Sequence, residues 1–255
     1  MEAELPAWLT GLSAFLLGAV VGSFLNVVIY RLPMSQSIVS PGSHCFDCGS
    51  PVRPVDNVPL VSWLVLMGQC RDCGATISSR YFFVELLTAV LTFIVVGRYG
   101  PTLTAFLYLV FVWGLIAVTF IDIDFQIIPD ELSVGGAVLG LAVAFLLPAG
   151  FKGAVAGALV GGGIFFALAI LYPGGMGGGD IKLMAAIGAF LGWRLALLTI
   201  ILGSVFGAVV GLSAMAFWGK GRKSRIPFGP FLAAAAVVSL LWGDAMISAY
   251  LSTFI

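Results

Sequence analysis

Two aspartates in this sequence stand out because of their surroundings. Asp180 directly follows the glycine-rich run 174–179 and lies between two long apolar segments. A second acidic cluster, Asp122 and Asp124 with Asp130 beyond them, follows an earlier apolar segment. Burying a carboxylate near lipid is expensive, so acidic residues in such places indicate a functional site.

Two carboxylates brought within a few ångströms cannot both ionise easily, so one holds a proton while the other acts as a base. Such a pair can activate water and protonate a departing amine, as peptide hydrolysis requires when neither a metal nor a covalent intermediate is used. We therefore predict that Asp122 and Asp180 meet and perform acid–base chemistry at a membrane surface. Glycines preceding Asp180 would let a substrate backbone lie against their loop. The predicted substrate loop is Gly177, Gly178 and Gly179.

Other interpretations of these acids stay open at this point. Asp122 and Asp180 are alternatively ordinary interfacial acids, or the ion site of a cation-coupled transporter built on a broken helix. For Asp124 and Asp130 a wet loop or a helix cap is the preferred interpretation, and Asp244 falls toward the opposite membrane face. The single histidine, His44, gives no convincing nucleophilic arrangement with serine or cysteine.

The elements that must position the aspartates are membrane-spanning helices. Of the 255 residues, 60% are hydrophobic and only 9% are charged, against about 25% in soluble domains. Mean hydropathy is +1.12, and apolar runs of about 20 residues recur along the chain. We predict an all-α polytopic membrane protein with about eight spans and a retained first helix. The predicted spans are 8–30, 82–97, 102–121, 132–149, 153–172, 181–193, 195–217 and 229–250, of which the second and sixth are short.

The basic residues predict the orientation of these spans. With the N-terminus outside, nine of the 12 Lys and Arg fall in inside loops and three in outside loops. The inside nine are Arg31, Arg53, Arg71, Arg80, Lys182, Lys220, Arg222, Lys223 and Arg225; the outside three are Arg98, Lys152 and Arg194. This orientation places both Asp122 and Asp180 at the cytoplasmic face.

One polar insert interrupts the apolar segments. Residues 31–81 follow the first span (1–30), contain five prolines and precede the rest of the membrane domain (82–255). The insert holds two CxxC pairs separated by 21 residues: Cys45 with Cys48, and Cys70 with Cys73. That spacing is typical of four-thiolate zinc sites, and zinc would stabilise an insert too small to build its own core. A structural, zinc-ribbon-like site is therefore expected. The alternatives are four free thiols, a redox pair or a catalytic zinc.

Several of these motifs, in this order, resemble one known family. Gly177-Gly178-Gly179-Asp180 matches the GxGD motif of membrane aspartic proteases, and the longer 175–183 stretch resembles that of bacterial type IV prepilin leader peptidases. Further matching segments are 23–33, the paired CxxC insert, Arg80-Tyr81 with 85–88, Asp122 with Asp130, and 227–230. The resemblance runs from about residue 10 to residue 240.

The resemblance implies a multi-pass inner-membrane aspartic endopeptidase with Asp122 and Asp180 as its catalytic pair. Members of the family remove the basic leader of type IV prepilins or type II secretion pseudopilins after a glycine, on the cytoplasmic side. Many also methylate the new N-terminus with S-adenosylmethionine, an activity associated with the insert (31–81). The expected partners are thus prepilin or pseudopilin substrates and the lipid bilayer, with no nucleic acid.

Overall fold

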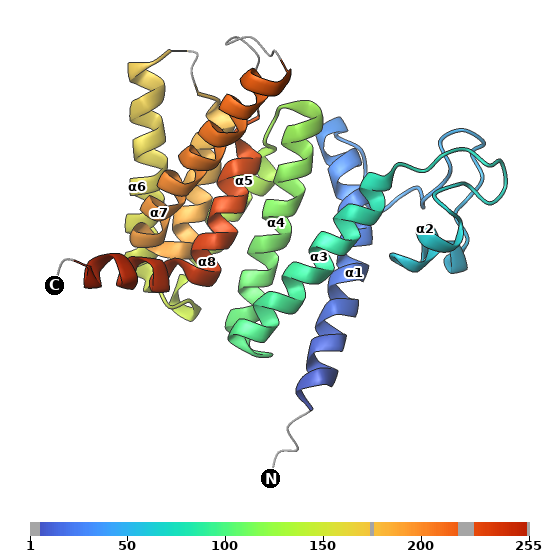
Figure 1. The fold of residues 1–255 in the computed structure, drawn as a ribbon, viewed down its shortest axis with the longest axis horizontal. Helices are drawn as coiled ribbons and strands as arrows, with labels where there is room; N and C mark the ends of the chain where they lie inside the picture. The colour runs from blue at the N-terminus through green and yellow to red at the C-terminus, as the bar shows by residue number, and fades with distance from the viewer. Residues whose placement is uncertain (1–5, 174–175, 219–226, 254–255) are drawn as a thin grey trace. The chain divides into compact units, whose positions relative to one another are not determined.

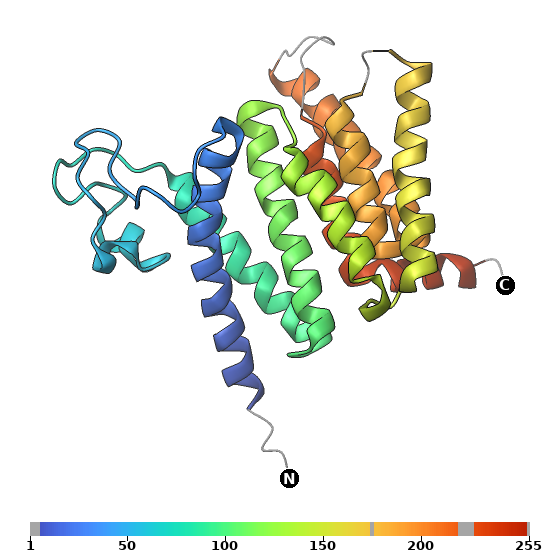
Figure 2. The same cartoon turned by 180° about the vertical axis from the view of Figure 1, so that it is seen from behind.

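The computed structural model describes residues 6–173, 176–218 and 227–253, whose regular elements are all helices (Figures 1 and 2). Two isolated β-bridges, His44 with Pro51 and Gln69 with Thr76, occur in the polar insert. The predicted all-α fold class is therefore confirmed. The chain divides into two compact units, residues 1–117 and 118–255.

The first unit is built on two long helices, α1 (Ala7–Arg31) and α3 (Ser79–Tyr99). They pack closely because α1 offers small residues to α3: a Cβ on Gly22 would lie 2.6 Å from the Cα of Glu85. Small residues let membrane helices approach in this way. The insert between them contains the short elements η1 (Leu32–Met34), η2 (Pro54–Asn57) and α2 (Val61–Val65).

The second unit contains the end of α4 (Leu103–Phe125), α5 (Asp130–Ala142), η3 (Ala144–Leu146), α6 (Gly150–Leu171), α7 (Gly178–Trp218) and α8 (Gly229–Ser252). Helices α6 and α7 approach most closely at two glycines, Gly157 and Gly188, where a Cβ on either would collide with the backbone of the other. Helix α8 packs on α7, and Thr199 Oγ1 donates a 3.0 Å hydrogen bond to Ser239 Oγ in this interface.

Helix α7 is interrupted at Gly192, whose φ of 78° and ψ of 169° are not helical. A straight helix of 41 residues would be about 60 Å long. Gly229 lies beside Asp122, in the same part of the unit as the start of α7. The chain between residue 218 and Gly229 spans at most about 40 Å, so it could not return there from the far end of a straight helix. The chain therefore turns back at Gly192, in the region predicted to separate the spans 181–193 and 195–217.

Replacing Gly192 by alanine is expected to lower stability by about 1–3 kcal/mol, because this backbone conformation is open essentially to glycine alone. The added Cβ would also lie 3.0 Å from that of Ala149. Thermal unfolding of the purified protein in detergent measures the effect. Gly163→Ala is the matched control, since its Cβ would have no neighbour within 4 Å. Equal unfolding temperatures for the two variants would contradict the strained turn.

The predicted count of eight spans is not confirmed. Among the described residues, six helices are long and apolar enough to cross a membrane: α1, α3, α4, α6, α7 and α8. The region of the predicted fourth span holds α5 and η3, and α5 alone has only 13 residues, about 20 Å against the ~30 Å of hydrocarbon. Helix α7 covers two predicted spans, which meet at Gly192. The second predicted span was too short, since α3 has 21 residues.

Some residues used in the predictions lie outside the described ranges. These are Gly174 and Gly175 of the glycine run and the four basic residues Lys220, Arg222, Lys223 and Arg225. The orientation predicted from the basic residues stays a prediction.

Candidate active site and four-cysteine centre

Asp122 lies in the last turn of α4 and is only 6% exposed. Its Oδ2 accepts a 2.9 Å hydrogen bond from the backbone N–H of Gly229, the first residue of α8. The first N–H groups of a helix have no partner within it, so this carboxylate satisfies one of them. A Cβ on Gly229 would lie 2.7 Å from the same oxygen, so only glycine leaves room for this contact.

Asp180 is the third residue of α7 and is partly buried, and its backbone N–H bonds the carbonyl of Gly177 at 3.2 Å. Its carboxylate interacts electrostatically with that of Asp122. The end of α4 and the first turns of α7 and α8, all in the second unit, thus supply the groups of this site. That Asp122 and Asp180 form one catalytic pair stays a prediction.

The three glycines before Asp180 have different surroundings. A Cβ on Gly179 would lie 2.9 Å from the Cβ of Ile128, so Gly179 permits close packing of the segment before α5. A Cβ on Gly177 would meet Asp180 Oδ2 at 3.2 Å, whereas one on Gly178 would have nothing within 4 Å. Close packing thus explains Gly179. The open space at Gly178 leaves the predicted substrate loop as a prediction.

An ion pair beside the aspartates was missed by the sequence interpretation. Asp130 begins α5, as the helix-cap interpretation predicted, and its Oδ1 lies 2.7 Å from Lys182 Nζ. Both side chains are exposed, so the pair contributes at most about 1 kcal/mol. It nevertheless joins the first turn of α5 to the first turn of α7. The opposite charge of Lys182, two residues after Asp180, was the only signal for it.

The four cysteines converge in the insert of the first unit. Their sulfur atoms all lie within 4.8 Å of one another, and none forms a disulfide. The two CxxC turns have the same backbone pattern: the N–H of Gly49 bonds Cys45 O, and that of Gly74 bonds Cys70 O, each at 2.9 Å. Both glycines have positive φ, 72° and 74°. The predicted convergence of the CxxC pairs is confirmed.

This donor set fits a tetrahedral zinc ion. Zinc–sulfur bonds of about 2.3 Å at tetrahedral angles place the sulfur atoms about 3.8 Å apart. The observed separation between Cys45 Sγ and Cys73 Sγ, from opposite turns, is 3.8 Å. Hydrogen bonds from the side chain and backbone of Ser50 lower the pKa of the Cys48 thiol to about 7. His44 is exposed, with its Nδ1 3.1 Å from the carbonyl of Gly42, and is not part of the cluster.

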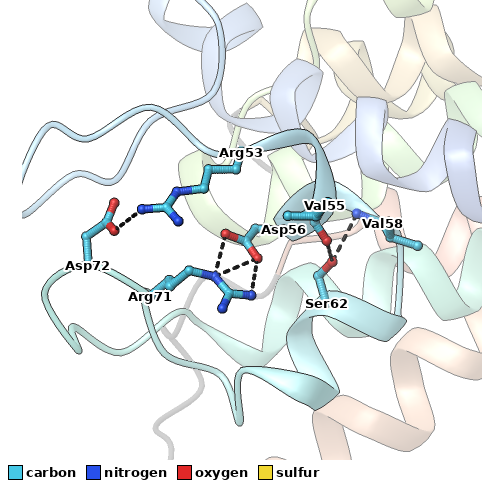
Figure 3. Close-up of polar contacts among 7 residues, drawn as sticks. All are labelled: Arg53, Val55, Asp56, Val58, Ser62, Arg71 and Asp72. Carbon is cyan, nitrogen blue, oxygen red and sulfur yellow. Dashed lines mark hydrogen bonds and ion pairs between the residues drawn. The ribbon is translucent and has the colours of Figure 1, made fainter.

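Two ion pairs connect the second CxxC turn to the segment around η2 (Figure 3). Arg71 forms a two-pronged contact with Asp56, with Nη2 2.6 Å from Oδ1 and Nε 2.9 Å from Oδ2. The Arg71 guanidinium holds the pKa of the Asp56 carboxyl below its usual value. Arg53 pairs with Asp72 at 2.8 Å. Arg71 and Asp72 are the two residues between Cys70 and Cys73, so both pairs fix the second CxxC turn to the segment around η2.

Comparison with known proteins identifies the family. Residues 16–99 match the bacterial peptidase A24 N-terminal domain, and residues 109–212 match the type IV leader peptidase family. A prepilin leader peptidase/N-methyltransferase of Aeromonas hydrophila is 38% identical over 97% of this chain and 96% of its own length. The chain belongs to the type IV leader peptidase family.

Two further relatives carry the same name. The protein of Pseudomonas aeruginosa is 39% identical over 94% of this chain and 93% of its own length. That of Myxococcus xanthus is 42% identical over 86% of this chain and 68% of its own. No solved structure matches.

The two matched family regions separate the four cysteines from the two aspartates. The A24 N-terminal domain contains all four cysteines, and the leader peptidase region contains both Asp122 and Asp180. The resemblance inferred from the motifs is thus confirmed, and no finding favours the transporter alternative.

Proposed function

We propose that this protein is a membrane leader endopeptidase that also methylates its product. It removes the basic leader of type IV prepilins or type II secretion pseudopilins after a glycine, at the cytoplasmic membrane face. The observation that supports this most is the position of the two aspartates in one unit: Asp122 accepts a hydrogen bond from the first residue of α8, and Asp180 lies in the first turn of α7. Membership of the leader peptidase family supplies the reaction class.

In the proposed reaction, Asp122 and Asp180 share one proton between them. The ionised carboxylate removes a proton from water, which attacks the carbonyl of the peptide bond. The protonated partner then gives its proton to the departing amine. The Gly229 N–H holds Asp122 Oδ2 in place during these steps, because it donates to that oxygen and leaves the other oxygen available. A segment bounded by Gly177, Gly178 and Gly179 would hold the cleaved peptide extended.

The proposed topology explains where this cleavage occurs. A prepilin presents an apolar helix preceded by a basic leader, so the bond between them lies at the inner boundary of the membrane. The topology predicted from the basic residues, with the N-terminus outside, puts both aspartates at that boundary; it requires α5 with η3 to cross the membrane and α7 to cross it twice. The chain then resides in the bacterial inner membrane, with its active site facing the cytoplasm.

In the proposed second activity, the insert (31–81) is part of the methyltransferase region. Its cysteines, Cys45, Cys48, Cys70 and Cys73, would hold one structural zinc ion, because four thiolates leave no open coordination position. When bound, S-adenosylmethionine supplies a methyl group that the neutral amine of the new N-terminus takes as the carbon–sulfur bond breaks.

Gly229→Ala is expected to lower leader cleavage by roughly 10²-fold, because its Cβ would push the Asp122 carboxylate out of position. The initial cleavage rate of a purified prepilin in detergent measures this effect. Gly163→Ala, with nothing within 4 Å of the added carbon, is the matched control and retains the rate. A normal rate in Gly229→Ala would show that the Asp122–Gly229 contact does not position the carboxylate.

Mass spectrometry of a prepilin produced together with this protein tests the proposed function as a whole. We expect a product that begins directly after the glycine of the leader and carries one added methyl group. An uncut precursor in membranes that contain the folded protein would refute the peptidase. A cut but unmethylated product would refute the second activity alone.

A further inference from the structure

The first unit contains a cavity of about 900 Å³, within the size range of small-molecule sites. It lies where the insert folds against α1 and α3 and is partly open to solvent. Asn26 and Tyr30 of α1, Trp63 of α2, and Tyr81 and Glu85 of α3 all line it. The peptidase chemistry uses none of these residues, and both aspartates belong to the second unit.

Glu85 is the most unusual group in this cavity. It is 8% exposed, and the polar groups that interact with its carboxylate are the Leu60 N–H, at 2.7 Å, and the Ser23 hydroxyl. Both are neutral, and no cation in the described part of the chain pairs with it. Leu60 donates from a conformation with φ of 64° and ψ of −50°, which is strained for leucine. A buried carboxylate without a counter-charge is costly, and a cationic ligand would offset that cost.

The charged side chains around the cavity indicate which charges a ligand would carry. Among the charged side chains that line it, Arg53 pairs with Asp72 and Arg71 pairs with Asp56. The remaining charged groups are one cation, Arg31, and two carboxylates, Asp47 and Glu85. The cavity therefore matches a ligand that carries one carboxylate and two positive groups.

Neutral groups in the cavity fit the same kind of ligand. Asn26 is 3% exposed; its Nδ2 donates to the Tyr81 carbonyl at 3.1 Å, while its buried Oδ1 has no hydrogen-bond partner in the described structure. Because Asn26 lines the cavity, this buried oxygen can accept a hydrogen bond from an ammonium or amino group once the amide turns toward the ligand. Aromatic rings attract onium groups and stack on purine bases. The rings that line the cavity include Tyr30 and Phe46, whose centroids are 5.1 Å apart, and Trp63.

We propose that this cavity is the methyl-donor site and that Glu85 binds S-adenosylmethionine through its positive charge. The donor has one carboxylate, one ammonium, one sulfonium and a purine, which is the set of groups that the cavity complements. This inference rests on the proposed methyltransferase function and gives it a location. After transfer the sulfonium is a neutral thioether, so Glu85 holds the used donor less tightly and favours its exchange.

The charge-specific part of the proposal is tested with Glu85→Gln, which keeps an acceptor for the Leu60 N–H and removes the charge. Equilibrium dialysis of the full chain in detergent measures binding of S-adenosylmethionine and of the neutral S-adenosylhomocysteine. The native protein should prefer the sulfonium, and Glu85→Gln should lose at least about tenfold of that preference. The exposed Glu131, changed to Gln, is the matched control and keeps the preference. An unchanged preference in Glu85→Gln would overturn the role of Glu85.

Hydrogen exchange of the native protein tests the location without any variant. Saturating S-adenosylmethionine should slow exchange in the segments that line the cavity, 36–53, 56–66 and 70–81. Protection by S-adenosylmethionine that is confined to other segments would overturn the proposed site. The site would also be overturned if a leader-free pilin peptide protected these segments and S-adenosylmethionine did not. If the protein still methylates a prepilin in that case, the proposed function stands and only its location is wrong.

Discussion

Replacing either Asp122 or Asp180 by asparagine should lower leader cleavage by about 10³-fold or more, because each carboxylate has a proton-transfer role that an amide cannot perform. The two variants should be equally inactive, and the double variant no worse than either, since residues that act as one unit show non-additive losses. The measurement is the initial rate of leader removal from a purified prepilin.

Asp244→Asn is the matched control for these variants. Asp244 is an exposed residue of α8 with no contact to the two aspartates, so its amide variant should cleave at the native rate. Native activity in Asp180→Asn would refute the dyad. Additive losses in the double variant would show that the two carboxylates act independently.

Removal of the metal should have the second large effect. We expect one zinc ion per chain, and we expect Cys45→Ser combined with Cys73→Ser to abolish its binding, because this change removes one ligand from each CxxC turn. Structural zinc contributes on the order of 10 kcal/mol to small metal-dependent domains. The insert should therefore lose its order, and hydrogen exchange across residues 43–76 should become at least about 100-fold faster. Elemental analysis and exchange mass spectrometry measure the two outcomes.

His44→Ala is the control for the cysteine variants. His44 adjoins Cys45 but lies outside the sulfur cluster, so its variant should keep the zinc and the slow exchange. A zinc content unaffected by the double cysteine change would refute the site. Loss of leader cleavage on metal chelation, with the insert still folded, would instead favour a catalytic metal.

The sequence was sufficient wherever the physical signal is local. Apolar runs predicted the helices, because the bilayer requires long segments that satisfy their own backbone hydrogen bonds. The CxxC spacing predicted the sulfur cluster, because a turn of four residues can place two thiols beside one ion. The order of motifs around Asp122 and Asp180 predicted the family. Each of these inferences uses residues that are close in the chain or a pattern repeated along it.

Hydropathy alone was misleading where helix length and direction matter. It predicted one span over 132–149, where the structure has α5, which ends at Ala142 and has 13 residues, followed by the short η3; this span is not confirmed. It also placed a boundary near residue 194 without indicating the cause, which is the conformation of Gly192. A glycine that adopts a positive φ and a glycine that permits close packing look the same in a sequence.

The tertiary structure alone decided which distant groups face each other. The Asp122–Gly229 hydrogen bond, the Asp130–Lys182 ion pair and the burial of Glu85 under the Leu60 N–H each join segments separated by 25 to 107 residues. No local pattern specifies such contacts, because they depend on how whole helices pack. The sequence thus determined the chemistry that this protein carries. The packing of its helices determined which groups surround its two predicted catalytic aspartates and where a third carboxylate remains buried without a counter-charge.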